Sequence, residues 1–147
     1  MKVMFVCTGN ICRSPMAEVI LKNIAPKSWT VSSSGTHAMT GWKMTDLSEK
    51  SLKQLKFRVG KGTRARQWSN QMLHDYDHVV CMTDDHKETI LSRLPAGEYP
   101  NLKTLNEWVG GGDIPDPYGL PLSVYLDCCL DLSQKLKELN EKINSGK

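Results

Sequence analysis

The chain opens with a change from a continuous apolar run to a helical pattern. Residues 2–7 are mostly apolar and end at a Thr-Gly-Asn segment, which is typical of a short buried strand. From Ser14 onward, a proline suited to a first helical turn precedes apolar residues at helical spacing: Met16, Ala17, Ile20, Leu21 and Ile24. The pattern therefore predicts a strand, a tight loop over residues 7–13, and a helix.

The rest of the chain continues this alternation. The pattern predicts further strands over residues 30–34, 77–83 and 101–105, and helices over residues 46–56 and 84–93. It also predicts a long closing helix with an apolar stripe typical of a core-facing surface, at Val124, Tyr125, Cys128, Cys129, Leu132, Leu136, Leu139 and Ile143.

Strands that alternate with helices favour an α/β fold. We expect a single three-layer domain over residues 1–147, with a central parallel, doubly wound sheet and helices on both faces. Ligands bind beyond the carboxyl ends of the strands in such sheets. The loop after the first strand is therefore placed where a functional site is expected.

Composition narrows the functional classes. Of the 147 residues, 39% are hydrophobic and 24% are charged, as in ordinary globular domains. No apolar run approaches the ~20 residues of a membrane helix, and a net charge of +3 without basic runs argues against nucleic-acid binding. The five cysteines are odd in number and irregularly spaced, which favours reduced thiols in a cytoplasmic protein. They form no metal-ligand pattern with the histidines, so we expect no metal and no other cofactor.

The segment Cys-Thr-Gly-Asn-Ile-Cys-Arg-Ser at residues 7–14 carries the candidate chemistry. A loop between a strand and a helix N-terminus can turn several backbone N–H groups inward and so bind an anion. Gly9 can adopt a positive φ at little cost, and Asn10 tolerates it better than most residues. The same positive environment favours the thiolate form of Cys7, which is the nucleophilic form of cysteine.

Two further side chains of this loop suit the handling of a phosphate group. Arg13 presents a planar fork that can hold two phosphate oxygens and keep them as charge spreads in the transition state. The Ser14 hydroxyl can donate a hydrogen bond to the sulfur of Cys7, both when the sulfur attacks and when it leaves. A Cys and an Arg five residues apart are a weak signal alone, and the preceding strand and following helix strengthen it.

The segment at residues 6–18, Val-Cys-Thr-Gly-Asn-Ile-Cys-Arg-Ser-Pro-Met-Ala-Glu, closely resembles the signature of the low-molecular-weight protein tyrosine phosphatases. Three later segments are similar to landmarks of that family in the same order: Ser-Ser-Gly-Thr at 33–36, Ala-Arg-Gln at 65–67 and Asp-Pro-Tyr at 116–118. The resemblance implies an enzyme that hydrolyses phosphotyrosine in a protein or peptide through a cysteinyl-phosphate intermediate. It also implies that inorganic phosphate is the product.

The resemblance assigns roles to individual residues. Asp116 would protonate the leaving oxygen and then activate water, with Cys7 as nucleophile and Arg13 as phosphate clamp. The loop residues expected to contact substrate are Thr8, Gly9, Asn10, Ile11, Cys12 and Ser14. The walls around the substrate ring are expected to include Ile11, Met39, Trp42 and Tyr118. Family members that act on phosphoarginine tend to carry Thr at the position of Ile11, so Ile11 favours tyrosine.

Two other functions stay open at the level of the residues. A thioredoxin-coupled arsenate reductase shares this fold and a similar loop, but it needs a cysteine relay, for which Cys81 is the lone candidate. A non-catalytic phosphopeptide-binding module would not need a nucleophile, a clamp and an acid together.

The sequence supports further expectations about the remaining cysteines, the histidines and the partners. By family precedent, Cys12 could form a reversible disulfide with oxidised Cys7. The adjacent Cys128 and Cys129 are expected to face the core. We expect a monomer, without nucleic-acid or membrane partners. We assign no role to the four histidines and expect them to be exposed: His37, His74, His78 and His86.

Overall fold

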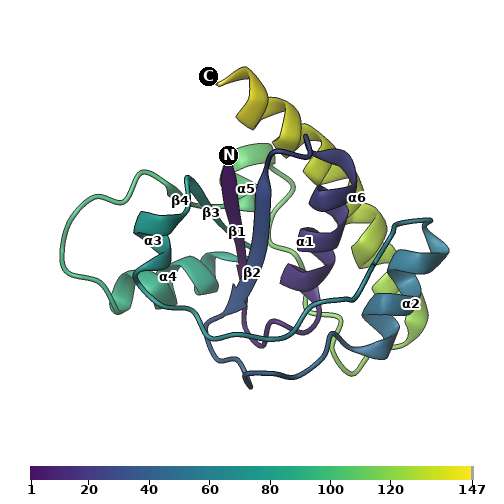
Figure 1. Cartoon of the computed structure of the whole chain (residues 1–147). Coiled ribbons are helices and arrows are strands. Elements are labelled where there is room, and N and C mark those ends of the chain that lie inside the picture. The colour runs from purple at the N-terminus through teal and green to yellow at the C-terminus, as the bar shows by residue number, and fades with distance from the viewer. Residues whose placement is uncertain (147) are drawn as a thin grey trace.

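A computed structural model describes residues 1–146, and Lys147, the last residue of the expected domain, lies outside the described residues. The elements follow in the order β1 (Lys2–Cys7), α1 (Arg13–Ile24), β2 (Thr30–Gly35), α2 (Asp46–Gln54), α3 (Met72–Asp75), β3 (His78–Cys81), α4 (Asp84–Ser92), β4 (Leu102–Thr104), α5 (Leu105–Val109) and α6 (Leu122–Ser145). They form the predicted α/β fold, in which helices cover both faces of one sheet (Figure 1).

The sheet is parallel throughout and has the strand order β2-β1-β3-β4. Cys7 at the end of β1 pairs in register with Gly35 of β2, and Val6 pairs with Cys81 of β3. The chain winds to one side of β1 and then to the other, so the carboxyl end of β1 is the switch point of the sheet. Ligands bind at this position in open α/β folds.

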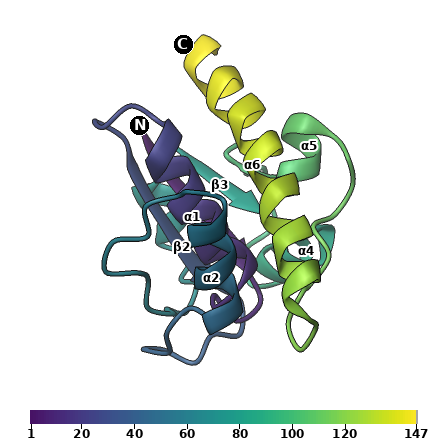
Figure 2. The same cartoon turned by 90° about the vertical axis from the view of Figure 1, so that its right-hand side faces the viewer.

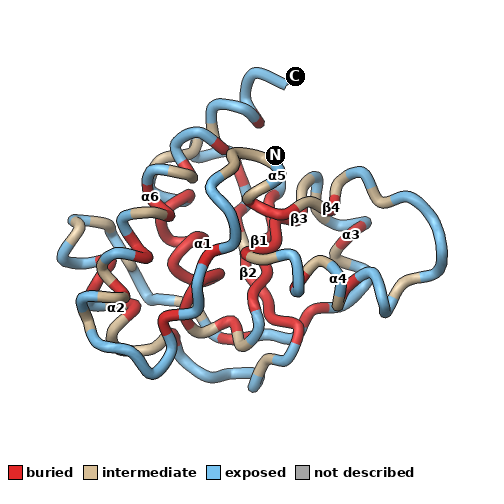
Figure 3. The backbone as a smooth tube through the Cα atoms, turned by 180° about the vertical axis from the view of Figure 1, so that it is seen from behind, coloured by how far each residue is buried: buried red, intermediate tan, exposed pale blue. Residues whose placement is uncertain are grey.

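Alternate residues of β1 belong to different cores. Val3 and Phe5 pack in the cluster that contains the buried residues of α1 and α6, whereas Met4 and Val6 pack with Leu73 of α3 and with α4. Figure 2 shows α1, α2 and α6 together on one side of the sheet. Buried residues concentrate in the strands and α1 (Figure 3). A strand buried on both faces needs apolar residues at consecutive positions, which explains the continuous apolar run.

The closing helix α6 buries most of its predicted stripe, including Cys128 and Cys129, as expected. Two strand ends differ from the sequence prediction because a threonine caps the following helix. The third strand ends at Cys81, because Thr83 instead caps α4 with its side chain. Leu105 begins α5, because Thr104 caps that helix in the same way. No helix within residues 1–146 combines the length and apolar character required to cross a membrane.

Candidate active site

The loop between β1 and α1 is held at its start by hydrogen bonds to the segment that follows β2. The carbonyl of Cys7 accepts a hydrogen bond from the N–H of Thr36, and the carbonyl of Thr8 accepts one from the N–H of His37, each at 2.9 Å. These bonds tie the loop's first carbonyls to the turn after β2. Within residues 1–146, the N–H groups of residues 8–12 donate to no other group of the chain. The loop therefore has free donors suited to an anion.

Asn10 holds the shape of this loop from inside. It is completely buried and has a φ of +58°, in the left-handed region that asparagine tolerates. Its amide nitrogen donates to Ser14 Oγ at 2.8 Å and to Ser33 Oγ at 2.9 Å, and its amide oxygen accepts from the Arg66 N–H at 3.0 Å. Of the two residues that the sequence indicated as able to adopt a positive φ, Asn10 does so and Gly9 does not.

The sulfur of Cys7 lies 2.9 Å from Ser14 Oγ. Because the Asn10 amide already donates to Ser14 Oγ, the Ser14 hydroxyl proton remains free for another acceptor. Its alternatives are the Cys7 sulfur and the Ser34 carbonyl, which lies farther away at 3.4 Å. The network therefore directs a hydrogen-bond donor at the sulfur, which stabilises negative charge there.

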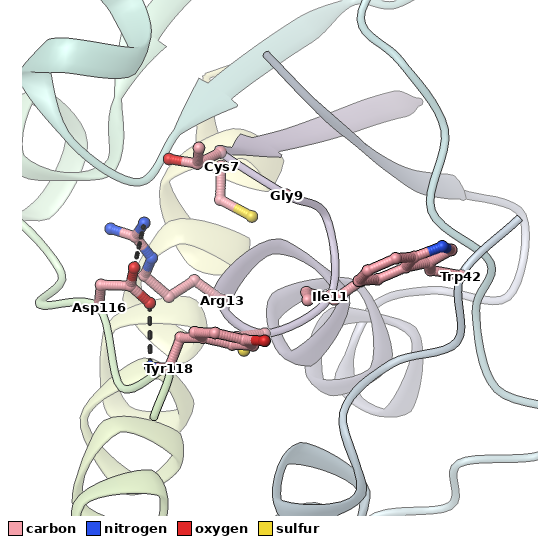
Figure 4. A pocket seen from close by; sticks show the side chains of 9 residues that line it. Cys7, Gly9, Ile11, Arg13, Trp42, Asp116 and Tyr118 are labelled. Carbon is pink, nitrogen blue, oxygen red and sulfur yellow. Dashed lines mark hydrogen bonds and ion pairs between the residues drawn. The ribbon is translucent and has the colours of Figure 1, made fainter. Parts of the chain in front are cut away.

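Arg13 connects the loop to the segment that carries Asp116. Its Nη1 donates to the carbonyl of Ile114 at 3.0 Å, and its Nη2 lies 3.7 Å from Asp116 Oδ2 (Figure 4). Asp116 Oδ1 accepts from the N–H of Tyr118 at 3.1 Å, which fixes the turn and the direction of the carboxylate. The Arg13 side chain is 7% exposed and the Asp116 side chain 55%. A buried cation therefore faces an accessible carboxylate.

These groups surround one cavity of about 260 Å³, into which Figure 4 looks. It is lined by Cys7, Thr8, Gly9, Ile11, Cys12, Arg13, Trp42, Asp116 and Tyr118. Asn10 and Ser14 lie fully buried behind the loop, and thus support the cavity from outside its lining. Met39 is 58% exposed and is not part of this lining, although Trp42 is. The cavity thus combines a charged floor with the apolar side chains of Ile11, Trp42 and Tyr118.

Gly35 is a supporting residue that the sequence marked only as the end of a strand. A Cβ atom at this position would lie 2.4 Å from the Thr8 carbonyl oxygen and 3.0 Å from the Asn10 nitrogen. Real Cβ atoms do not approach backbone atoms so closely, so any side chain would displace the loop. Only the family landmark at residues 33–36 gave a signal for it.

A buried chain of hydrogen-bonded polar groups extends from Asn10 through β2 to α1. Ser33 Oγ accepts from Asn10 and donates to Glu18 Oε1 at 2.6 Å, and Glu18 Oε2 pairs with Lys22 at 2.6 Å. Glu18 is only 8% exposed. Both of its oxygens have partners, which offsets the free-energy cost of burying a charged carboxylate. Glu18 and Ser33 belong to segments that resemble the family's landmarks, but no local pattern predicts that they contact each other.

His86 contradicts the expectation that the histidines are exposed. It is 5% exposed and its Nε2 lies 2.9 Å from Thr8 Oγ1. Burial and the neighbouring Arg13 lower the pKa of His86 to about 4, so the ring is neutral near pH 7. Only the tertiary structure shows that this helix residue reaches the loop.

The other thiols differ from Cys7 in their surroundings. Cys12 Sγ lies 3.5 Å from Tyr125 Oη and 3.6 Å from Thr45 Oγ1. Burial raises the pKa of the Cys12 thiol, although these hydrogen bonds oppose the effect. Cys81 is fully buried in β3, and burial raises the pKa of its thiol strongly. Cys81 is therefore unsuited to act as the exposed redox relay of an arsenate reductase.

Comparison with known proteins identifies the class of molecule that this fold and cavity represent. The family model described as low molecular weight phosphotyrosine protein phosphatase matches residues 2–147. The chain belongs to this family, and it is a hydrolase that acts on phosphoric monoesters. Phosphatases of this family act on phosphoproteins and release phosphate.

Individual relatives carry two kinds of name. A protein-arginine-phosphatase of Geobacillus stearothermophilus is 35% identical over 150 residues, which cover 98% of this chain and 97% of the relative. The low molecular weight protein-tyrosine-phosphatase PtpB of Staphylococcus epidermidis is 37% identical over 146 residues, which cover 96% of this chain and all of the relative. The names of the relatives therefore include both phosphotyrosine and phosphoarginine enzymes.

Solved structures show the same division. The YwlE arginine phosphatase from Geobacillus stearothermophilus superposes with a TM-score of 0.89 at 34% identity, covering 99% of this chain and 94% of that one. A low molecular weight protein tyrosine phosphatase from T. tengcongensis gives 0.88 at 36% identity, covering 97% and 99%. Overall similarity does not separate the two substrates, so the lining of the cavity must be considered.

Proposed function

We propose that this chain is a protein tyrosine phosphatase in which Cys7 is the nucleophile, Arg13 binds the phosphate, and Asp116 is the general acid and base. One observation carries the proposal: a thiol and a guanidinium from one loop and a carboxylate from a distant segment line a single cavity with three apolar walls. The free N–H groups of residues 8–12 supply further donors at the cavity floor. Donors preorganised around a developing anion are a large source of rate acceleration.

In the first step, the Cys7 sulfur attacks phosphorus and the bond between phosphorus and the phenolic oxygen breaks. Protonated Asp116 gives its proton to that oxygen, so tyrosine leaves as a neutral phenol. Arg13 and the loop N–H groups hold the equatorial oxygens as charge spreads over them. The product of this step is a phosphate covalently bound to sulfur.

In the second step, water attacks the cysteinyl phosphate and the sulfur–phosphorus bond breaks. Asp116, now a carboxylate, accepts a proton from that water, and inorganic phosphate is released. The sulfur leaves as a thiolate, which the Ser14 hydroxyl stabilises from 2.9 Å. Because Arg13 and backbone donors neutralise the phosphate, we expect full activity in the presence of EDTA.

Phosphoarginine is the second candidate substrate, because relatives at 35% and 31% identity are named protein-arginine-phosphatases. Ile11, Trp42 and Tyr118 present apolar surface to the substrate, which suits the ring of phosphotyrosine better than a strongly polar phosphoguanidinium group. Matched phosphotyrosine and phosphoarginine peptides test this choice, together with the variant Ile11→Thr. Equal turnover of the two peptides by the wild type would contradict the tyrosine assignment.

The catalytic roles are tested by hydrolysis of p-nitrophenyl phosphate and a phosphotyrosine peptide. Cys7→Ser should abolish turnover, a loss of at least about a thousandfold. Asp116→Asn should reduce turnover of the peptide by about a hundredfold or more. The loss with p-nitrophenyl phosphate should be smaller, because its leaving group needs less protonation. Asp75→Asn is the control, since this exposed carboxylate at the end of α3 lies outside the cavity.

We further propose that Cys12 protects Cys7 during oxidation. Both thiols line the cavity from the same loop. A sulfenic acid on Cys7 would react with the Cys12 thiol to form a disulfide and release water. Mass spectrometry after mild peroxide treatment should detect a Cys7–Cys12 link that dithiothreitol reverses, and Cys12→Ser should instead accumulate irreversible Cys7 oxidation. Sulfonate on Cys7 of the wild type without any such link would refute protection.

A further inference from the structure

His86 occupies an unusual place between two loops. It is the third residue of α4, and the residue is 5% exposed. Because β1 and β3 are parallel neighbours, their carboxyl ends bring Thr8, which follows β1, next to the loop that follows β3. His86 spans this junction, with Thr83 on one side of its ring and Thr8 on the other.

The hydrogen bonds determine which ring nitrogen carries the proton. The backbone N–H of Thr83 donates to Nδ1 of His86 at 3.2 Å, and a backbone N–H can only donate. Nδ1 is therefore the acceptor, and the proton of the neutral ring is on Nε2. Nε2–H then donates to Thr8 Oγ1 at 2.9 Å.

This bond determines what the Thr8 hydroxyl can do. With its oxygen accepting from His86, Thr8 still has its own proton to donate. Thr8 lines the catalytic cavity beside Cys7 and Arg13, and it also lines a second, polar cavity of about 290 Å³ that contains His86. The hydroxyl thus lies between the histidine and the phosphate site.

We infer that His86 is a positioning residue that orients the Thr8 hydroxyl as a hydrogen-bond donor to the bound phosphate. This inference rests on the proposed phosphatase function. His86 also fastens the first residue of the loop to the N-terminus of α4, since the same ring caps that helix. The low pKa of His86 keeps Nδ1 available as an acceptor over the neutral pH range.

The test separates the contact with Thr8 from the cap at Thr83. In His86→Asn, the side-chain oxygen can replace Nδ1 as the acceptor for Thr83, but the side chain is too short to reach Thr8. In His86→Gln, the amide nitrogen can take the position of Nε2. Inorganic phosphate binding is measured by isothermal titration calorimetry, and kcat and KM are measured with p-nitrophenyl phosphate. His74→Asn, at an exposed histidine of α3, is the control.

We expect His86→Asn to weaken phosphate binding about fivefold to tenfold and to raise KM by a similar factor, while kcat changes less than threefold. His86→Gln should recover most of the loss. Thr8→Val should have the same effect as His86→Asn, and the double variant should be no worse than either single variant. Unchanged phosphate binding in His86→Asn, or additive losses in the double variant, would overturn the inference. An inactive wild-type protein that still binds phosphate would refute the proposed function and leave this test intact.

Discussion

The two halves of the cavity are built differently. On the phosphate side, Asn10 and Ser14 are completely buried and Arg13 nearly so, and each has fixed hydrogen-bond partners. On the opposite side, Trp42, Tyr118 and the Asp116 side chain are each more than half exposed. In the proposed function, the buried half would bind the group that is common to all phosphate esters. The exposed half would contact the part of the substrate that differs between proteins.

This difference has a physical basis. Stabilising the charge of a transferring phosphate requires donors that do not reorganise during the reaction, and burial in a hydrogen-bonded network provides them. Selecting a leaving group requires only apolar contact and one well-directed carboxylic acid. We therefore expect changes behind the loop to lower the rate with every substrate, and changes at the rim to affect particular substrates.

The largest effect is expected from Gly35→Ala, which would displace the loop that forms the buried half. The new methyl group would collide with the Thr8 carbonyl at 2.4 Å and push the loop out of position. A misplacement of this kind can cost about a hundredfold in rate, and we expect that loss in kcat/KM with both p-nitrophenyl phosphate and peptide. Gly97→Ala is the control, because its Cβ would make only ordinary contacts with Tyr99 from 3.8 Å. Near-normal activity of Gly35→Ala would contradict the tight support of the loop.

Acidification should destabilise the folded protein, because His86 becomes protonated. The folded-state pKa of His86 is lowered to about 4 from an ordinary value of 6.5, so the unfolded chain binds this proton more readily. The stabilisation is complete above pH 6.5 and is lost as the pH falls toward 4. The charged groups that act on the ring are Arg13, which lowers the pKa, and three carboxylates that oppose it, Asp85, Asp113 and Asp116.

Comparison with His86→Asn isolates this contribution, since the other titrating groups are common to both proteins. We expect the free energy of unfolding of the wild type, relative to the variant, to fall by about 3 kcal/mol between pH 7 and pH 4. Urea denaturation at several pH values measures it. Parallel pH profiles for the two proteins would show that His86 does not titrate in this way.

Ser14→Ala should have a smaller effect than Gly35→Ala, because Asn10 loses one of its hydrogen bonds but keeps those to Ser33 and Arg66 that hold the loop. The hydroxyl that lies 2.9 Å from the Cys7 sulfur would be lost. We expect about a tenfold lower kcat, together with a slower reaction of Cys7 with iodoacetamide at pH 6. Ser51→Ala is a matched control, at a buried helix serine whose hydroxyl has no hydrogen-bond partner within residues 1–146 and lies outside the site. An unchanged alkylation rate would mean that Ser14 does not stabilise the thiolate.

The smallest effects are expected at the exposed rim. Tyr118→Ala and Trp42→Ala should each raise KM about fivefold for a phosphotyrosine peptide, because an aromatic contact is worth about 1 kcal/mol. Inhibition by inorganic phosphate should stay the same, since Arg13 and the loop, and not these two side chains, are proposed to bind phosphate. Leu130→Ala, at an exposed residue of α6, serves as the control. A loss of phosphate inhibition in the rim variants would remove the distinction between the two halves.

The sequence determined the elements whose signals are local. The continuous apolar run of β1, the proline and helical spacing of α1, and the stripe of α6 each reflect burial along one element, so their patterns were readable in advance. The short helices α3 and α5 were not predicted, because four or five residues are too few to show a period. Cys7 and Arg13 were identified for a similar reason, since both belong to one short strand–loop–helix segment.

Only the tertiary structure determined how distant segments meet at that loop. The close approach of Gly35, the donor chain from Asn10 to Glu18, and the contact between His86 and Thr8 all depend on parallel strands that end at one edge of the sheet. Trp42 lines the cavity and Met39 does not, although both lie in the same exposed loop. Such contacts follow from packing in three dimensions, and no local pattern of hydrophobic and polar residues encodes them.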